Sequence, residues 1–384
     1  MLNAPPPFTI DSQQLYLEIT QSPEEQQPYS TSGACQRGWI NQKCLQAFLP
    51  WFKEEIAPTA RVYPNSAALP SFWEVVNGTA ITFDRDRLVL IPTLAIDGDE
   101  LRVPQEWVDI PELVADYYIA VQVNPDEGWM KIFGYTTHQI LKTKGVYDVG
   151  DRTYSLEGED LIADINVLWV TRQLNHSEAL RAEIAPLAPI AKTQAENLLE
   201  RLGDPDVKFP RLAVPFSLWG ALLAHGGWRK KLSELRQGLL IQWSIPQWLQ
   251  TGVANLAQQW GWEKREFLVV PGGMRSAEPF LGLSRQIIVA QNTYELRIFP
   301  KSASEDYVWR FELQSTTPGP GGQIPAGFKL RLLTEDLQAF ENNQDTATTP
   351  VNMLYLEVIL ELGEALVWEI EPAPEDYDRE ILRF

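Results

Sequence analysis

Cysteine is scarce in this chain, since its 384 residues include only two, Cys35 and Cys44. Two cysteines are too few to cross-link a protein of this size, which favours a reducing compartment. They are also too few for a cysteine-based metal site, because structural zinc sites take about four ligands. A redox or metal role for the pair is therefore a minor alternative.

Signals for export or membrane insertion are also lacking. Residues 1–7 contain no basic residue and no apolar run, and Asp11 follows soon after them, so the start does not resemble a signal peptide. No stretch approaches the roughly 20 consecutive apolar residues that span a bilayer. These absences predict a cytoplasmic protein.

Histidine is equally rare, with only His138, His176 and His225 in the chain. None of them stands at a metal-ligand spacing from another histidine, a cysteine or a carboxylate of a known motif. His138 follows the end of an expected strand, where a polar site could form, but a lone histidine is more often hydrogen-bonded and structural. Nucleophile motifs and phosphate-binding glycine loops are missing too. The sequence therefore predicts no catalytic residue, no metal and no cofactor.

Basic residues are outnumbered, because 32 Lys and Arg stand against 51 Asp and Glu, for a formal charge of −19. An acidic surface repels phosphate backbones and disfavours general nucleic-acid binding. Two acidic loops, residues 84–86 and 97–100, could hold calcium. They do not reproduce the twelve-residue calcium loop, so solvated turns are the simpler interpretation. Paired carboxylates for glycoside hydrolysis stay open, because their separation is a three-dimensional property.

The main contrast to this acidity is a basic segment, residues 208–236, with six basic residues against Glu234 alone. Its last part predicts a helix with a basic face and an apolar face, which is most simply a solvated surface helix. Two sharper hypotheses are that the helix docks on the chain's own acidic C-terminal region, or that it binds an acidic partner, including nucleic acid. The candidate partner-binding residues are Trp228, Arg229, Lys230, Lys231 and Arg236.

The first region, residues 1–174, is expected to combine strands with flanking helices. Asn77-Gly78, between the β-rich residues 73–76 and 79–81, predicts a hairpin. Short antiparallel strands with tight turns favour a small barrel or curled sheet, on which a helix at 159–174 packs its apolar stripe. The other expected elements are a helix at 41–56, interrupted at Pro50, and strands at 72–83, 87–91, 117–123 and 129–135.

The second region, residues 175–261, is expected to be helical, and the third, residues 262–384, returns to strands. Expected helices lie at 177–183, 190–202, 215–225, 228–236 and 244–260, and expected strands at 266–270, 284–290, 293–299, 307–314, 354–360 and 365–370. In the third region apolar residues alternate with polar ones, which favours an antiparallel sandwich with one buried face. The expected fold class is α+β, with a β-rich, barrel-like N-terminal domain, a helical middle and a C-terminal β-sandwich.

Several long motifs resemble one known family. They are WEVVNGTAI at 73–81, LRVPQEWVDIP at 101–111, ADYYIAVQVNPDEGW at 115–129, GYTTH at 134–138, RFEL at 310–313 and IPAGFKL at 324–330. Together they are similar to a cyanobacterial family known only as domain of unknown function 1822. The resemblance implies a cyanobacterial source and carries no activity or functional residues with it.

These observations predict a non-catalytic regulatory or protein-interaction protein, because separate acidic and basic surfaces suit steering between proteins. Its expected partner is another protein, with an acidic partner left open as an alternative, and the oligomeric state stays open. One alternative is a hydrolase-type enzyme with a site between domains, which a polar pocket with a convergent carboxylate pair would favour. The other is a nucleic-acid-associated regulator that uses the basic helix.

Overall fold

The computed structural model describes residues 14–20, 29–98, 100–174, 180–239, 244–251, 261–269, 278–301, 308–317 and 322–384. The chain forms two compact units. Unit 1 comprises residues 1–188, 199–224 and 235–238, and unit 2 comprises residues 189–198, 225–234 and 239–384. Among the described residues, no helix is both long and apolar enough to cross a lipid bilayer.

Unit 1 is built on a curled six-stranded sheet, as the sequence predicts in outline. The strands follow the order β1-β7-β6-β4-β3-β2, and all neighbours are antiparallel except β4 and β6, which run parallel. Buried residues of β3, β4, β6 and β7 form most of the sheet's contribution to one hydrophobic core. The strands are β1 (Leu15–Glu18), β2 (Arg61–Val62), β3 (Thr79–Phe83), β4 (Asp86–Thr93), β6 (Tyr117–Asn124) and β7 (Trp129–Thr137).

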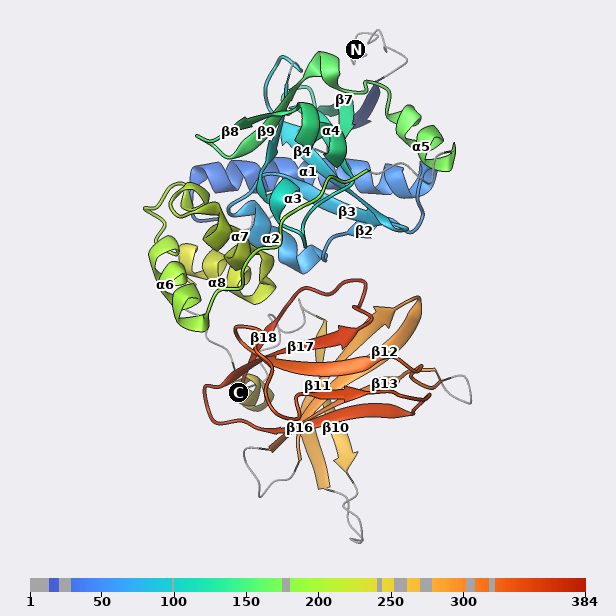
Figure 1. The fold of residues 1–384 in the computed structure, drawn as a ribbon, viewed down its shortest axis with the longest axis vertical. Helices are drawn as coiled ribbons and strands as arrows, with labels where there is room; N and C mark the ends of the chain where they lie inside the picture. Colours follow the sequence, from blue (N-terminus) through green and yellow to red (C-terminus); the bar gives the residue numbers. More distant parts are fainter. Residues whose placement is uncertain are drawn as a thin grey trace, which may run out of the picture. The chain divides into compact units, whose positions relative to one another are not determined.

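Helix α1 (Ser32–Glu55) lies across one face of this sheet (Figure 1). It begins where the Thr31 side chain accepts a backbone N–H three residues on, which satisfies one of the free donors of a helix start. The sequence predicted a shorter helix, at 41–56, interrupted at Pro50. That prediction was wrong at both points, since the helix starts earlier and continues through Pro50. Burial of its apolar side, including the fully buried Phe52, offsets the roughly 3 kcal/mol that an internal proline costs.

The predicted hairpin at Asn77-Gly78 is not present. Residues before it form the short helix α2 (Leu69–Trp73), which starts with Pro70 in its first turn, and only β3 follows as a strand. The dipeptide therefore joins a helix to a strand. Gly78 has a φ of 116°, and a Cβ there would lie 2.7 Å from the Trp107 Nε1 atom, so this close approach requires glycine.

A second, three-stranded sheet of unit 1 has the order β5-β9-β8. Its strands are β5 (Glu100–Pro104), β8 (Val146–Asp148) and β9 (Thr153–Glu157). Short helices α3 (Glu106–Asp109) and α4 (His138–Lys144) flank it in the chain. The helix predicted at 159–174 starts later than predicted, as α5 (Ile165–Leu174). Its predicted packing on the sheet is confirmed, because Ile165, Leu168 and Trp169 are buried in the sheet's core.

The middle of the chain is helical, with α6 (Lys192–Leu202), α7 (Phe216–Ala224), α8 (Gly226–Arg236) and α9 (Ile245–Thr251). These match four predicted helices, although the end of the last prediction, 252–260, lies outside the described residues. The helix predicted at 177–183 is not found in its described part, since residues 180–183 are not helical. Pro186 and Pro189 follow closely, and prolines disfavour helix in the residues that precede them.

Unit 2 contains two antiparallel sheets, of order β10-β11-β12-β13-β16 and β15-β14-β17-β18. Inward residues of both sheets, among them Phe311 and Trp368, belong to one hydrophobic core, as the predicted sandwich requires. Along β16 the burial alternates as the sequence pattern predicted. The strands are β10 (Trp262–Val269), β11 (Glu278–Val289), β12 (Asn292–Pro300), β13 (Val308–Ser315), β14 (Lys329–Thr334), β15 (Gln344–Thr346), β16 (Met353–Ile359), β17 (Ala365–Glu371) and β18 (Ile381–Arg383).

Candidate functional site

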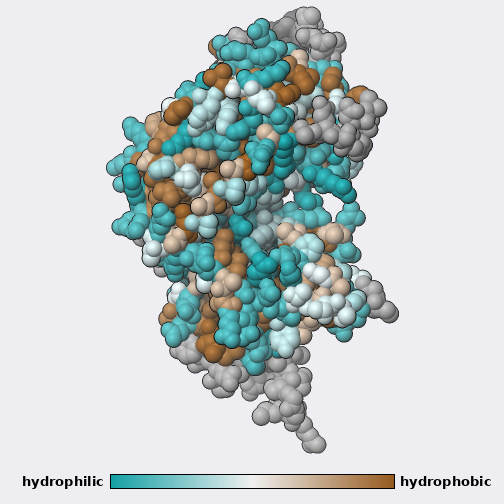
Figure 2. Space-filling model, viewed as in Figure 1, coloured by the Kyte–Doolittle hydropathy of each residue, from teal (hydrophilic) through white to brown (hydrophobic). Residues whose placement is uncertain are grey.

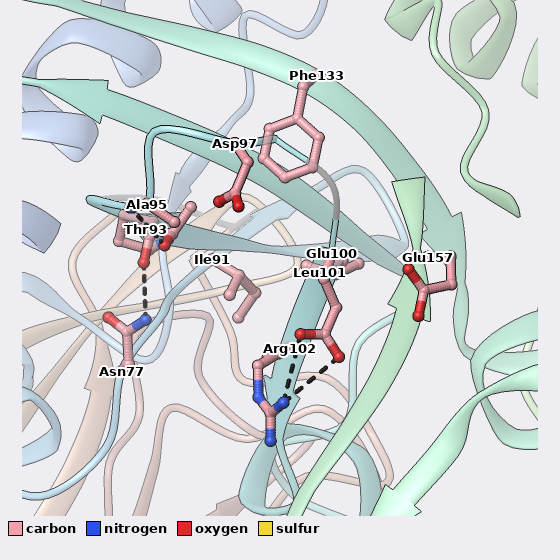
Figure 3. A pocket seen from close by; sticks show the side chains of 11 residues that line it. Asn77, Ile91, Thr93, Ala95, Asp97, Glu100, Leu101, Arg102, Phe133 and Glu157 are labelled. Carbon is pink, nitrogen blue, oxygen red and sulfur yellow. Dashed lines mark hydrogen bonds and ion pairs between the residues drawn. The ribbon is translucent and has the colours of Figure 1, made fainter. Parts of the chain in front are cut away.

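A cavity of about 430 Å³ in unit 1 is the best candidate for a functional site (Figure 3). It lies where the end of β4 meets β5, β7 and β9. Its apolar part includes Ile91, Leu101 and Phe133, and several charged side chains surround them. Concave sites that combine an apolar wall with a few polar groups are the usual form of a binding pocket. The described lining residues are Asn77, Ile91, Pro92, Thr93, Ala95, Asp97, Glu100, Leu101, Arg102, Phe133 and Glu157.

Three carboxylates share this pocket. Glu100 on β5 and Glu157 on β9 are direct cross-strand partners, and Asp97 comes from the loop that precedes β5. Figure 3 shows these carboxylates around the same space as the ring of Phe133. Like charges directly opposite each other destabilise a strand pair, so this arrangement has a cost that a bound cation would remove.

Among the residues that the structure describes, one cationic side chain, Arg102, lines the pocket. Arg102 donates to Asp151 at 2.8 Å and lies 3.3 Å from Glu100, and its hydrogen bond to Asp151 raises the pKa of Arg102. Asp97 and Glu157 make no ion pair with any residue that the structure describes. The lining residues in the described part of the chain therefore carry three negative charges and one positive charge, which suits a positively charged group.

The wall of the pocket near Asn77 is held by hydrogen bonds. The Asn77 Nδ2 atom donates to the Pro92 carbonyl at 2.9 Å, and its Oδ1 atom accepts from Asn41 of α1 at 2.8 Å. The Trp107 indole donates to the Asn77 carbonyl at 2.8 Å. Asn41 also accepts from the Gly78 N–H at 3.1 Å. A site on such a fixed scaffold is formed before any ligand binds.

The loop between β4 and β5 forms the edge of the pocket. Gln122 of β6 donates to the Ala95 carbonyl at 3.0 Å, and the Ala95 N–H donates to Thr93 at 3.1 Å. Next to Ala95, Ile96 is 96% exposed, and Leu94 is also exposed. Two exposed apolar side chains thus lie at the edge of the charged pocket, where the surface of a bound protein would cover them.

The basic helix that the sequence proposed as a partner surface is α8, and the structure corrects its expected exposure. Trp228, Arg229 and Arg236 are 3%, 1% and 3% exposed. Arg229 pairs with Asp378 of the acidic C-terminal region, which is one of the two alternatives drawn from the sequence. The sequence predicted that these arginines would lie on a solvated face. A guanidinium group can instead be buried when carboxylates and backbone carbonyls accept its hydrogen bonds.

Arg236 shows how completely such a group is satisfied. Its Nε atom donates to the buried Glu74 at 3.1 Å, and its Nη1 atom donates to three carbonyls. Only Lys230 and Lys231 of the proposed set are partly exposed. Burial lowers the pKa of Lys230 to about 8, and it lies 3.6 Å from Glu234. A partner role for α8 thus stays a prediction that these two lysines alone could carry.

The two described histidines are buried and bonded to the backbone. In His138 the Nδ1 atom accepts from the Ala182 N–H at 3.0 Å, and the Nε2 atom lies 2.9 Å from the Val108 carbonyl. Burial lowers the pKa of His138, so the ring is neutral with its proton on Nε2. This is the structural role that the sequence favoured. His225 is similar, and His176 lies outside the described residues.

The acidic loop 84–86 is neutralised within the chain. Arg172 of α5 lies 2.9 Å from Asp84 and 2.5 Å from Asp86, so these carboxylates pair with arginine and are not arranged around a metal ion. Nowhere in the described ranges do three or more His, Cys, Asp or Glu side chains form a group that could hold a metal ion. Cys35 is exposed, Cys44 is buried, and both thiols are free.

The pocket itself was missed by sequence reasoning. The acidic loop at 97–100 was noticed as a possible calcium loop, but Glu157 and Phe133 were not connected with it. Glu100 and Glu157 meet only because of the register between β5 and β9. Knowledge of that strand pairing is the signal that would have found the site.

Comparison with known proteins gives a family and nothing beyond it. No curated protein and no solved structure matches the chain. A family model does match, over residues 17–383, and it is described as a protein of unknown function, DUF1822. That match confirms the resemblance found in the sequence motifs. Since it covers nearly the whole sequence, the chain belongs to the DUF1822 family.

Proposed function

We propose that this chain is a non-catalytic interaction protein of the cyanobacterial cytoplasm, and that the unit 1 pocket receives a basic side chain of a partner protein. The observation that carries the proposal is the meeting of Asp97, Glu100 and Glu157 around Phe133 in one cavity. A lysine or arginine head group would lie between the carboxylates and against the aromatic ring, where ion pairing and cation–π attraction act together.

A protein is favoured over a small cation because of Ile96. This side chain is 96% exposed and stands between two residues that line the pocket. A small ligand inside the cavity would leave it in water, whereas a partner surface around an inserted basic side chain would cover it. Anchor residues in a pocket surrounded by apolar contacts are the common pattern of protein interfaces.

The test compares the wild-type full chain with the variants Glu100→Gln, Glu157→Gln and Glu18→Gln in capture from a native extract. Glu18 is an exposed carboxylate on β1 of the same unit, so it is the matched control. A carbodiimide that joins carboxylates to lysine amines is added, and the joined residues are located by mass spectrometry. We expect one partner to be joined through Asp97, Glu100 or Glu157, and its capture to fall about tenfold in the two pocket variants alone.

The proposal fails if the pocket variants capture the same proteins as wild type, or if Glu18→Gln loses them equally. It also fails if the chain binds spermidine through the pocket carboxylates and captures no protein that depends on them. In that case the pocket serves a small cationic ligand.

The hydrolase alternative retains one observation, the Glu100–Glu157 pair. Side chains directly opposite each other on antiparallel strands have Cβ atoms roughly 5 Å apart. Rotation of the two side chains can bring their carboxyl groups to the roughly 5 Å separation of retaining glycosidases. Glu157, however, is exposed and Glu100 is only partly buried, while catalytic electrostatics depend on a water-excluded site. Turnover of aryl glycosides by wild type, lost in Glu157→Gln, would favour the hydrolase.

A further inference from the structure

Unit 2 contains a second cavity, of about 370 Å³, and it differs in charge from the first. Its walls come from β14, β15, β17 and the segment between β14 and β15. Arg331 on β14 and Glu369 on β17 are cross-strand partners, and Arg379 lies just before β18. The site is separate from the unit 1 pocket and does not depend on the function proposed there.

The lining of this second cavity carries two guanidinium groups and one carboxylate. Arg379 Nε lies 3.2 Å from one oxygen of Glu369, and Arg331 Nη1 lies 3.7 Å from the other oxygen. The second distance is too long for a hydrogen bond. Glu369 therefore lies between two guanidinium groups, and Arg331 also pairs through Nη2 with Glu371, in a chain whose formal charge is −19.

Arg331 adds an independent indication. Its Nε–H group is buried and has no hydrogen-bond acceptor among the residues that the structure describes. Buried donors without a partner are rare, and a charged donor is the most costly kind. Leu333, Leu337 and Ala339 form an apolar part of the same wall.

We propose that this cavity binds a small oxyanion, a phosphate or carboxylate group, through Arg331 and Arg379. When the ligand is absent, Glu369 hydrogen-bonds to Arg379 and lies near Arg331, so it competes with the ligand for these two guanidinium groups. Guanidinium groups match both anions because their N–H groups form a planar fork. If Glu369 competes with the oxyanion for these guanidinium groups, removing the Glu369 carboxylate should strengthen binding of the oxyanion.

The experiment is titration calorimetry of the full chain with inorganic phosphate and, separately, with malonate, at constant ionic strength in chloride. Saturable binding of either probe is expected. Arg379→Gln should weaken it about tenfold, and Glu369→Gln should strengthen it by a similar factor. Arg310→Gln is the control, because Arg310 makes comparable ion pairs with Glu312 and Glu357 on β13 and β16.

The two probes identify the ligand class, since tighter binding of one selects phosphate or dicarboxylate as the natural group. The proposal is refuted if neither probe saturates by about 10 mM. It is also refuted if Glu369→Gln binds no more tightly than wild type, or if Arg310→Gln weakens binding as much as Arg379→Gln. The gain expected from Glu369→Gln cannot be produced by a variant that merely unfolds.

Discussion

His225 is expected to make the stability of this protein fall steeply in mild acid. The ring is 2% exposed and stacks on Trp228 at 4.2 Å. Its Nδ1 atom lies 3.4 Å from the Trp228 N–H and accepts from it, and its Nε2 atom lies 3.1 Å from the Glu335 carbonyl. A protonated ring would lose the first of these contacts. Burial, assisted by the charge of Arg379, lowers the pKa of His225 to about 3.

The sign and size of the effect follow from that shift. Between pH 6.5 and about 3 the unfolded chain binds a proton at His225 that the folded chain excludes, so acid favours unfolding. The contribution of the neutral ring is complete above pH 6.5 and is lost progressively as the pH falls below that value. The pH of 4.5 lies about two units below the unfolded pKa of 6.5 and above the folded pKa of about 3. The folded state therefore loses about 2–3 kcal/mol of stability relative to pH 7.5.

The measurement is urea unfolding of wild type and His225→Gln from pH 7.5 to pH 4.5, followed by tryptophan fluorescence. Glutamine can still donate to the Glu335 carbonyl but cannot titrate. We expect the variant to be less stable by about 1–2 kcal/mol at pH 7.5, because it loses the helix-start acceptor and the stacking. Its further loss in acid should be smaller than that of wild type by about 2–3 kcal/mol. Carboxylates titrate in both proteins, so equal pH slopes would refute the reasoning.

Three further predictions concern packing and accessibility. Glu106→Gln should lower the free energy of unfolding by about 3 kcal/mol, because the Arg211 guanidinium would lose its carboxylate partner. Chemical denaturation measures this change, and a value below about 1 kcal/mol would contradict the prediction. Gly78→Ala should lower the free energy of unfolding by about 1–3 kcal/mol, because Gly78 has a φ of 116° and an added Cβ would lie 2.7 Å from the Trp107 indole nitrogen. A melting temperature equal to that of wild type would contradict this prediction. A thiol reagent should label Cys35 quickly in the folded protein and Cys44 only after unfolding, and equal labelling rates would show that the buried thiol is accessible.

The strands of unit 2 could be predicted from the sequence because each has one buried face. In β16 the buried Leu354 and Leu356 alternate with exposed Tyr355 and Glu357, which is the pattern that a half-buried strand imposes. On the face of the molecule shown in Figure 2, hydrophobic residues occur in separate groups among hydrophilic ones. The alternation of apolar and polar residues along a strand such as β16 is visible in the sequence without knowledge of which strands pair.

The hairpin prediction in unit 1 failed for a physical reason. Asn-Gly is a strong turn signal, but Phe72 and Trp73 are both buried, and a short helix places them in the core as well as a strand would. Short apolar runs do not distinguish helix from strand by periodicity. Tertiary packing around Trp107 decided between the two, and that contact cannot be read from the local sequence.

The pocket could not be predicted, because its residues come from β4, β5, β7 and β9 and the loop before β5. Each carboxylate alone resembles an ordinary solvated side chain. Only the register that places Glu100 opposite Glu157 turns two unremarkable residues into a concentrated negative charge. Register depends on the whole pairing of the sheet, so a sequence search for short motifs has nothing to detect here.

The burial of the arginines in the basic segment, residues 208–236, explains why the pocket carboxylates, rather than these basic residues, indicate the charge of a partner. Arg211, Arg229 and Arg236 each pair with a carboxylate far away in the sequence. Each such pair removes one positive and one negative charge from the surface, so the excess of 19 negative charges remains while the cations that would screen it decrease. Attraction at a distance then favours basic partners and weakens with salt. If Asp97 and Glu157 are the carboxylates that act, raising the salt concentration should weaken partner capture in wild type and change it little in Glu157→Gln.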